Sequence, residues 1–167
     1  MSTLYLLRHA RAGWALPGMS DFDRPLDETG TADSQATAIA MRMRAYVPDI
    51  TLCSNARRCR QTLEAIAEHV DTGRVNFLDT LYSEDAAGYL RIIQENGCHS
   101  SVLVIGHNPM MEDLAIAVSG SGEDHVLAAL RSGFPTSGLA VIHFDEPLSS
   151  AAPGKGRLVD FVTPADL

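Results

Sequence analysis

Short apolar runs separated by longer helical patterns are the feature that most restricts how this chain can fold. Runs of strand character lie at residues 3–7, 49–54 and 101–106, and SVLVIG in the last of them is the strongest strand pattern in the chain. Strands that alternate with helices of ten or more residues are typical of an α/β fold. We therefore predict an α/β sandwich whose central sheet is largely parallel.

The helices between these strands are indicated by the spacing of apolar residues. Over about residues 31–46, apolar side chains such as Ile39 and Met43 recur at the interval of an α-helix. Residues 56–70 and 86–96 also have helical patterns. Such helices supply the long connections that parallel strands require.

The last third of the chain has a different pattern. Two late strands, at residues 137–144 and 156–164, follow each other without an intervening helix. One of them is therefore expected to run antiparallel at the edge of the sheet. The segment SGSGED, at residues 119–124, is rich in Gly and Ser and is expected to be a loop.

Length and composition narrow the class of protein. The 167 residues fit one domain, which we expect to span residues 1–167. A formal net charge of −8 gives no basic field to attract nucleic acid or an anionic membrane. Three widely spaced cysteines indicate free thiols rather than a disulfide framework or a zinc site. No apolar run approaches the roughly 20 residues of a membrane span, and no signal-peptide pattern is present, so a cytoplasmic location is expected.

Polar side chains follow three of the predicted strands at the point where each strand ends. Arg8 and His9 end the first strand, Ser54 ends the second and His107 follows the third. The carboxyl ends of parallel strands share one edge of a sheet, and ligands bind in the crevice there. We therefore expect His9 and His107 to meet, although they are remote in sequence.

Arginine and histidine side chains at one edge suit phosphoryl chemistry. A guanidinium group matches phosphate oxygens with two donors, so Arg8 and Arg58 are expected to hold a phosphoryl group. A neutral imidazole can attack phosphorus, and nearby arginines would disfavour protonation of His9. His107 could donate a hydrogen bond to a phosphoryl oxygen. This scheme requires no metal ion or other cofactor, because the arginines neutralise the charge.

The segments around these residues resemble the motifs of the histidine phosphatase superfamily. LLRHARAG is similar to its Arg-His-Gly signature, with Ala10 in place of Gly. SNARRCRQT resembles its second motif, in which a phosphate-binding Arg follows a Ser by four residues, and VIGHNP resembles its third. DFDRPLDETG is similar to a segment of the SixA-type phosphohistidine phosphatases. Together these matches cover most of residues 3–110.

The resemblance implies a three-layer α/β/α sandwich with a mostly parallel sheet, like that of phosphoglycerate mutase, and a phosphorylated His9 intermediate. It places Arg8, Arg58 and His107 in the phosphate pocket and adds Arg24, from the Arg-Pro-Leu segment, as a substrate-binding residue. The short chain leaves little length for a roof over the site. The expected substrate is therefore a phosphohistidine on the surface of a partner protein.

The general acid and the substrate class stay open at this point. Superfamily members that act on phosphate esters use a carboxylic acid, and the matching segment LYSEDAAG offers Glu84 first and Asp85 second. The SixA branch can dispense with the acid, because a protonated imidazole departs without one. The alternatives are a small-molecule phosphomonoester phosphatase with Glu84 as the acid, a non-catalytic phosphoprotein-binding module, and a metallohydrolase with His9 and His107 as ligands.

Several other polar and aromatic residues are interpreted as structural or solvent-exposed. Trp14 and Met19 are expected to pack within the loop after the first motif rather than to line a substrate entrance. Arg57 and Arg60 are expected to be solvated charges at the start of a helix.

Overall fold

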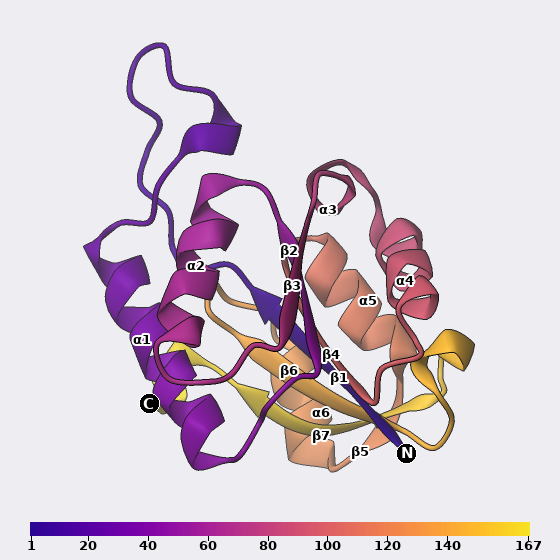
Figure 1. Cartoon of the computed structure of the whole chain (residues 1–167). Coiled ribbons are helices and arrows are strands. Elements are labelled where there is room, and N and C mark those ends of the chain that lie inside the picture. Colours follow the sequence, from indigo (N-terminus) through magenta and orange to yellow (C-terminus); the bar gives the residue numbers. More distant parts are fainter.

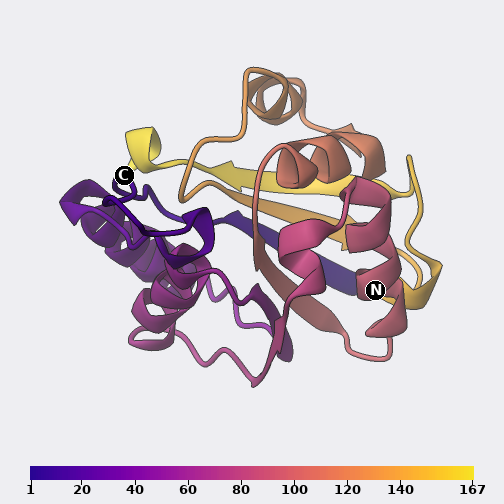
Figure 2. The ribbon, with the colours of Figure 1, turned by 90° about the horizontal axis from the view of Figure 1, so that it is seen from above.

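A seven-stranded sheet with helices on both faces forms the centre of the molecule in the computed structural model, which describes residues 1–167 (Figures 1 and 2). The strand order is β3-β2-β4-β1-β6-β7-β5. The strands are β1 (Ser2–Arg8), β2 (Ile50–Ser54), β3 (Arg74–Leu78), β4 (Ser101–Gly106), β5 (Ser119–Gly122), β6 (Leu139–Phe144) and β7 (Gly156–Val162). The predicted three-layer α/β fold with a mostly parallel sheet is confirmed.

The helices divide between the two faces of the sheet (Figure 2). The first two cover one face, and the other four cover the opposite face. They are α1 (Glu28–Met43), α2 (Arg57–Ala67), α3 (Thr80–Ser83), α4 (Ala86–Glu95), α5 (Met110–Val118) and α6 (Asp124–Arg131). A short 3-10 helix, η1 (Asp21–Asp23), interrupts the loop between β1 and α1. No helix combines the length and apolar character needed to cross a membrane.

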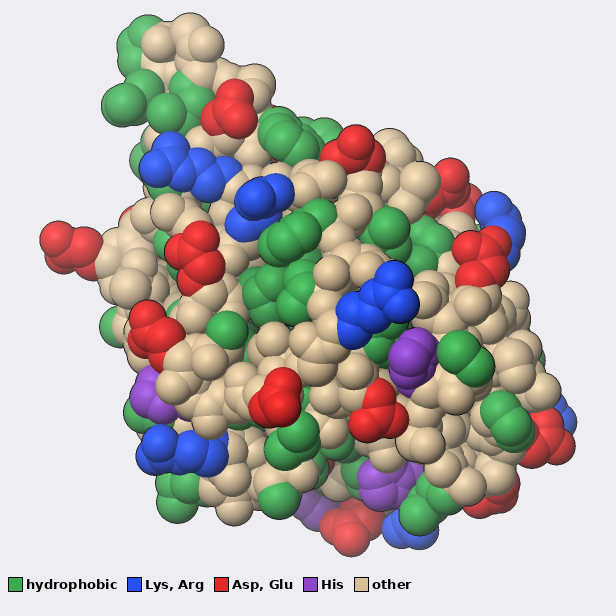
Figure 3. All heavy atoms as spheres, viewed as in Figure 1, with side chains coloured by type: hydrophobic (Ala, Val, Ile, Leu, Met, Phe, Trp, Pro, Cys, Tyr) green, Lys and Arg blue, Asp and Glu red, His purple; other side chains and the backbone are tan.

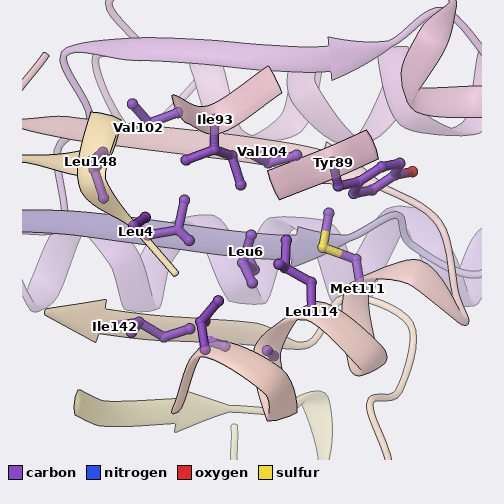
Figure 4. Packing of buried hydrophobic residues seen from close by; sticks show 14 of the residues in the cluster. Leu4, Leu6, Tyr89, Ile93, Val102, Val104, Met111, Leu114, Ile142 and Leu148 are labelled. Atoms are coloured by element: carbon purple, nitrogen blue, oxygen red, sulfur yellow. The ribbon is translucent and has the colours of Figure 1, made fainter. Parts of the chain in front are cut away.

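The alternation of side chains along β1 separates two hydrophobic cores. Leu4 and Leu6 are fully buried toward α4 and α5, and Figure 4 shows Leu6 near Leu114 and Met111. Tyr5 and Leu7 point the other way, into the core formed with α1 and α2. A strand buried on both faces has an uninterrupted apolar run as its sequence, which is the pattern that predicted it.

The antiparallel strand is not at the edge, which corrects the prediction. β6 runs antiparallel to both of its neighbours, β1 and β7, and is buried inside the sheet. The edge strands are β3 and β5. Residues 139–142 are continuously apolar, and a strand of that kind suits a covered central position.

The predicted loop at residues 119–124 was also wrong in part, because it contains β5. This strand pairs only with β7, and none of its residues is buried, so its sequence carries no apolar pattern. Gly120 lies so close to the Gly154 backbone that a β-carbon there would be 2.1 Å from the Gly154 carbonyl oxygen. The glycines that suggested a loop are thus required by the close approach of two backbones.

The parallel strands β2, β4 and β1 are neighbours, so their carboxyl ends lie side by side. Arg8 pairs in register with Gly106, and Cys53 pairs with Ile105. The residues that follow these pairs therefore emerge at the same edge of the sheet.

Candidate functional site

His9 is the first residue beyond β1, and its contacts define which ring nitrogen carries the proton. Nδ1 lies 2.7 Å from the carbonyl oxygen of Ala10, which can only accept, so Nδ1–H is the donor. Arg58 Nε donates to His9 Nε2 at 3.3 Å. Nε2 therefore holds a lone pair and faces the arginine. The ring is 8% exposed, and Nε2 is positioned as a nucleophile in a nearly closed site.

The turn after His9 accommodates Ala10 without strain. Ala10 is fully buried and is not among the residues with positive φ, so it does not need the conformational freedom of the usual Gly. Its N–H donates to Thr62 Oγ1 at 2.9 Å, and the Thr62 hydroxyl donates to the Arg58 carbonyl at 2.7 Å. These bonds fasten the turn carrying His9 to the helix carrying Arg58.

Arg58, in the first turn of α2, uses two edges of its guanidinium group. The inner edge faces the imidazoles, with Nε on His9 and Nη2 3.4 Å from His107 Nδ1. The outer edge binds Asp21, with Nη1 donating to its carbonyl at 2.7 Å and Nη2 to its Oδ2 at 3.0 Å. Asp21 thus fixes the plane of a side chain that is only 7% exposed. The inner edge of the Arg58 guanidinium group therefore faces the space beside His9 and His107.

His107 follows β4 and completes the cluster. Its ring centroid lies 5.2 Å from that of His9, and its Nε2 lies 2.8 Å from Ser54 Oγ. Its backbone N–H donates to the Tyr89 hydroxyl at 3.3 Å, and that hydroxyl donates to the Leu81 carbonyl. Ser54 and Tyr89 therefore hold His107 from two directions, one through the ring and one through the main chain.

Both imidazoles are neutral near pH 7. Burial lowers the pKa of His9 to about 3, and the charges of His107, Arg58 and Arg8 act in the same direction. Burial, followed by the charge of Arg58, lowers the pKa of His107 to about 4. The nucleophilic lone pair on His9 is therefore available over the physiological pH range.

Arg8 contributes a donor that has no partner. Its Nη1 donates to the Phe134 carbonyl at 2.9 Å, while its buried Nε–H is unpaired. Burial lowers the pKa of the guanidinium group, and the charge of Glu112 opposes that shift. A buried unpaired N–H on a cation is a site for an oxygen of a bound anion.

Asp21 is a site residue that the sequence analysis missed. Its carboxylate accepts from Tyr82 at 2.8 Å, from Arg24 at 2.8 Å and from Arg58. The Tyr82 hydrogen bond is the largest cause lowering the Asp21 pKa to about 2, with contributions from Arg24 and Arg58. Arg24 thus reaches the cluster through Asp21 and does not contact either histidine. In DFDRPL, Asp21 lies one helical turn before Arg24, and that spacing indicates only the pair of Asp21 with Arg24.

The structure does not bring Glu84 into this cluster. Its side chain lies against Gly88 and lines a separate cavity that also includes Asn76 and Arg91. Asp85 caps α4, where its Oδ1 accepts from the Gly88 N–H at 2.8 Å. Tyr82, two residues before Glu84, is the residue of this segment that reaches the site, with its ring 5.3 Å from that of His107.

The site holds one cysteine thiol but no set of metal ligands. No three His, Cys, Asp or Glu side chains lie close enough together to hold a metal ion. Cys53, Cys59 and Cys98 are free thiols, as predicted. Cys59 lies 3.5 Å from His107 Nε2, and burial raises its pKa to about 12, so it is protonated.

The bond between Asp21 and Arg58 leads to a testable expectation. In the variant Asp21→Asn, we expect kcat to fall about tenfold or more, because an outer-shell partner that orients a catalytic side chain is removed. KM for phosphorylated substrate should not rise, since every positive charge is retained. Steady-state kinetics with Asp23→Asn, a neighbour in η1 that accepts from Ser20, provides the matched control. An unchanged kcat in Asp21→Asn would show that Arg58 does not depend on Asp21.

Comparison with known proteins identifies relatives over most of the chain. The family model of the histidine phosphatase superfamily (branch 1) matches residues 4–89. The uncharacterized protein Rv1276c of Mycobacterium tuberculosis is 32% identical over 161 residues, covering 95% of this chain and 99% of that protein.

Two solved structures are similar along nearly the whole length. A candidate phosphohistidine phosphatase SixA from Agrobacterium tumefaciens has a TM-score of 0.85 and 42% identity, covering 98% of both chains. A candidate phosphohistidine phosphatase SixA from Nakamurella multipartitia also has a TM-score of 0.85, with 28% identity, covering 98% of this chain and 96% of that chain.

Proposed function

The chain belongs to branch 1 of the histidine phosphatase superfamily, and from that premise we propose that it is a metal-independent phosphohistidine phosphatase acting through a phosphorylated His9. Membership of the superfamily implies a phosphatase. The proposed intermediate on His9 is supported by the position of its Nε2 lone pair, which lies on the inner edge of Arg58 and opposite His107. The similarity to SixA proteins supports phosphohistidine as the substrate class.

The first proposed step transfers the phosphoryl group to the enzyme. The His9 Nε2 lone pair attacks phosphorus, and the bond between phosphorus and the substrate imidazole breaks. The departing ring keeps the electron pair of that bond. When its second nitrogen is already protonated, it leaves as a neutral imidazole and needs no acid from the protein.

The second step releases inorganic phosphate. Water attacks phosphorus, the bond to Nε2 breaks, and the electron pair returns to Nε2, while the water gives its proton to solvent. Throughout both steps Nδ1–H donates to the Ala10 carbonyl. That bond keeps the proton on Nδ1, so His9 also departs as a neutral imidazole.

The surrounding donors stabilise the transferring group. Arg58 and Arg8 would each direct an N–H at its oxygens, and Arg8 Nε has no other partner. Arg58 Nη2 can only donate, so His107 Nδ1 accepts from it and the proton of His107 is on Nε2, which donates to Ser54 Oγ. His107 would offer Nδ1–H to the bound anion once Arg58 Nη2 turns to the anion and the Ser54 hydroxyl donates to Nε2 instead. Positioning and charge neutralisation of this kind supply most of the catalysis in phosphoryl transfer.

The placement of carboxylates favours phosphohistidine over a phosphate ester. An ester needs an acid for its leaving oxygen, and Glu84 makes no contact with the cluster. Asp21 contacts Arg58, but a pKa of about 2 leaves it ionised and unable to donate a proton. A protonated imidazole leaving group has no such requirement.

Phosphate release from two substrates tests the proposal. We expect kcat/KM for a phosphohistidine-bearing protein to exceed that for an alkyl phosphate ester such as glycerol phosphate by about a hundredfold or more, since each 1.4 kcal/mol of leaving-group stabilisation is tenfold. Glu84→Gln should change neither value, and a strong chelator should leave both intact. Equal hydrolysis of the ester, with its loss in Glu84→Gln, would support the phosphomonoester alternative. Loss of activity in the chelator would favour a metallohydrolase, and absence of any turnover would favour a binding module.

A further inference from the structure

An arm that carries an exposed tryptophan projects beside the candidate site (Figure 1). Its stem is closed by a bridge between Ala12 and Leu26 and by the Gly13 N–H donating to the Pro25 carbonyl at 3.0 Å. Trp14 is 95% exposed and Leu16 is 66% exposed. The prediction that Trp14 packs within its loop was therefore wrong. A large aromatic side chain left in water is costly unless another surface covers it.

The arm is attached to the same residues that orient Arg58. Arg24 Nε donates to the Gly13 carbonyl at 2.9 Å, and its Nη1 donates to Asp21 Oδ1 at 2.8 Å. Asp21 in turn binds Arg58. The base of the arm is thus held at a defined position next to the cluster.

Exposed positive charge lies at the start of α2, a helix that packs against η1 of the arm. Arg57 and Arg60 are exposed in the first turn of α2, next to the buried Arg58, and neither forms an ion pair with a carboxylate. Arg60 donates to Asn55 Oδ1 at 2.8 Å and lies over the Phe77 ring. Figure 3 shows basic side chains where the arm meets the body of the molecule, and apolar side chains at the tip of the arm. On a chain with a net charge of −8, unpaired arginines at this edge are complementary to an acidic partner.

We propose that the apolar tip (Trp14 and Leu16) and the two exposed arginines at the start of α2 (Arg57 and Arg60) form a docking surface for the protein that carries the phosphohistidine. The partner would present an apolar patch to the tip and acidic residues to the arginines while its phosphoryl group enters the site. The proposal rests on the proposed function and refines its substrate class. A ligand confined to the cluster of imidazoles does not cover the projecting tip, so the surface distinguishes a protein from a small molecule.

Kinetics with a large and a small substrate test the docking surface. The probes are a histidine-containing phosphotransfer domain with an acidic surface, phosphorylated with phosphoramidate, and free phosphohistidine. In the double variant Trp14→Ala/Leu16→Ala, we expect kcat/KM for the domain to fall about tenfold or more, as for an exposed aromatic anchor of an interface. The value for free phosphohistidine should stay unchanged. Met43→Ala, which removes another exposed apolar side chain from α1, is the matched control.

The positive charge at the start of α2 is tested separately. Arg57→Glu should lower kcat/KM for the phosphorylated domain and weaken its dependence on salt, because a long-range attraction is replaced by repulsion. Free phosphohistidine should be hydrolysed as before. Equal losses on both substrates, or no loss on the domain, would overturn the docking surface.

Fluorescence provides a binding readout that is independent of turnover. Trp14 is the only tryptophan of the chain, so the emission of the protein reports on the tip of the arm. In His9→Ala, the phosphorylated domain should move the emission to shorter wavelength, and inorganic phosphate should not. Absence of a shift at saturating domain would overturn the inference. If the wild type hydrolyses free phosphohistidine or an ester but not the domain, the proposed protein substrate fails instead.

Discussion

In His9→Ala we expect phosphoryl transfer to be lost, with kcat falling by about four orders of magnitude or more. The reason is that His9 Nε2 carries the lone pair proposed to attack phosphorus, on the inner edge of Arg58, and alanine leaves no atom that can form the intermediate. The measurement is phosphate release from a phosphohistidine-bearing protein under single-turnover and steady-state conditions. The wild type should in addition retain phosphate that is labile in acid and stable in base, and the variant should retain none.

His125→Ala is the matched control for the loss of an imidazole. Its side chain is exposed and lies in α6, away from the cluster. This variant should keep both turnover and the trapped phosphate. If the His9→Ala protein still formed the acid-labile adduct, His9 would not be the nucleophile, and His107 would be the first candidate to replace it.

Arg58→Lys should lower kcat/KM by about a hundredfold to a thousandfold, although the charge is conserved. The guanidinium group serves both imidazoles with one edge and Asp21 with the other. A lysine ammonium is a single point of charge and cannot occupy both edges. The lysine keeps the positive charge that helps to lower the pKa of His107, so the acid limb of the pH–rate profile should stay near its wild-type position.

Arg131→Lys, an exposed change in α6, controls for the substitution itself. The thermal unfolding of both variants should be compared, because Arg58 is buried and its replacement leaves Asp21 with only Tyr82 and Arg24 as partners. Near wild-type kcat/KM in a folded Arg58→Lys protein would remove Arg58 from the proposed anion site.

Much of the fold could be predicted because buried strands and strand ends have strong local signals. The apolar runs of β1, β2 and β4 identified three central strands, and the rule that parallel strands share an edge brought His9 to His107. The resemblance to the superfamily then selected Arg58 rather than Arg57. The structure places Arg58 inside, 7% exposed, and Arg57 outside.

The parts that could not be predicted depend on contacts between segments. The apolar spacing that predicted α1 does not mark its buried face, since Ile39 and Met43 are exposed while Thr37 and Ala38 are buried. Similarly, Asp21 becomes a site residue only because η1 folds back onto Arg58. No local pattern encodes which charged group in a polar loop meets a buried arginine.

The acceptor that fixes the proton of His9 is a main-chain carbonyl, and main-chain atoms are not altered by substitution. Mutation can reshape the arm, the arginines and the surface around the site while the reacting nitrogen keeps its electronic state. During evolution such a chain can change its binding partners while it keeps the same nucleophile. A designer seeking a new phosphorylated target can therefore diversify the surrounding loops and leave the turn after β1 untouched.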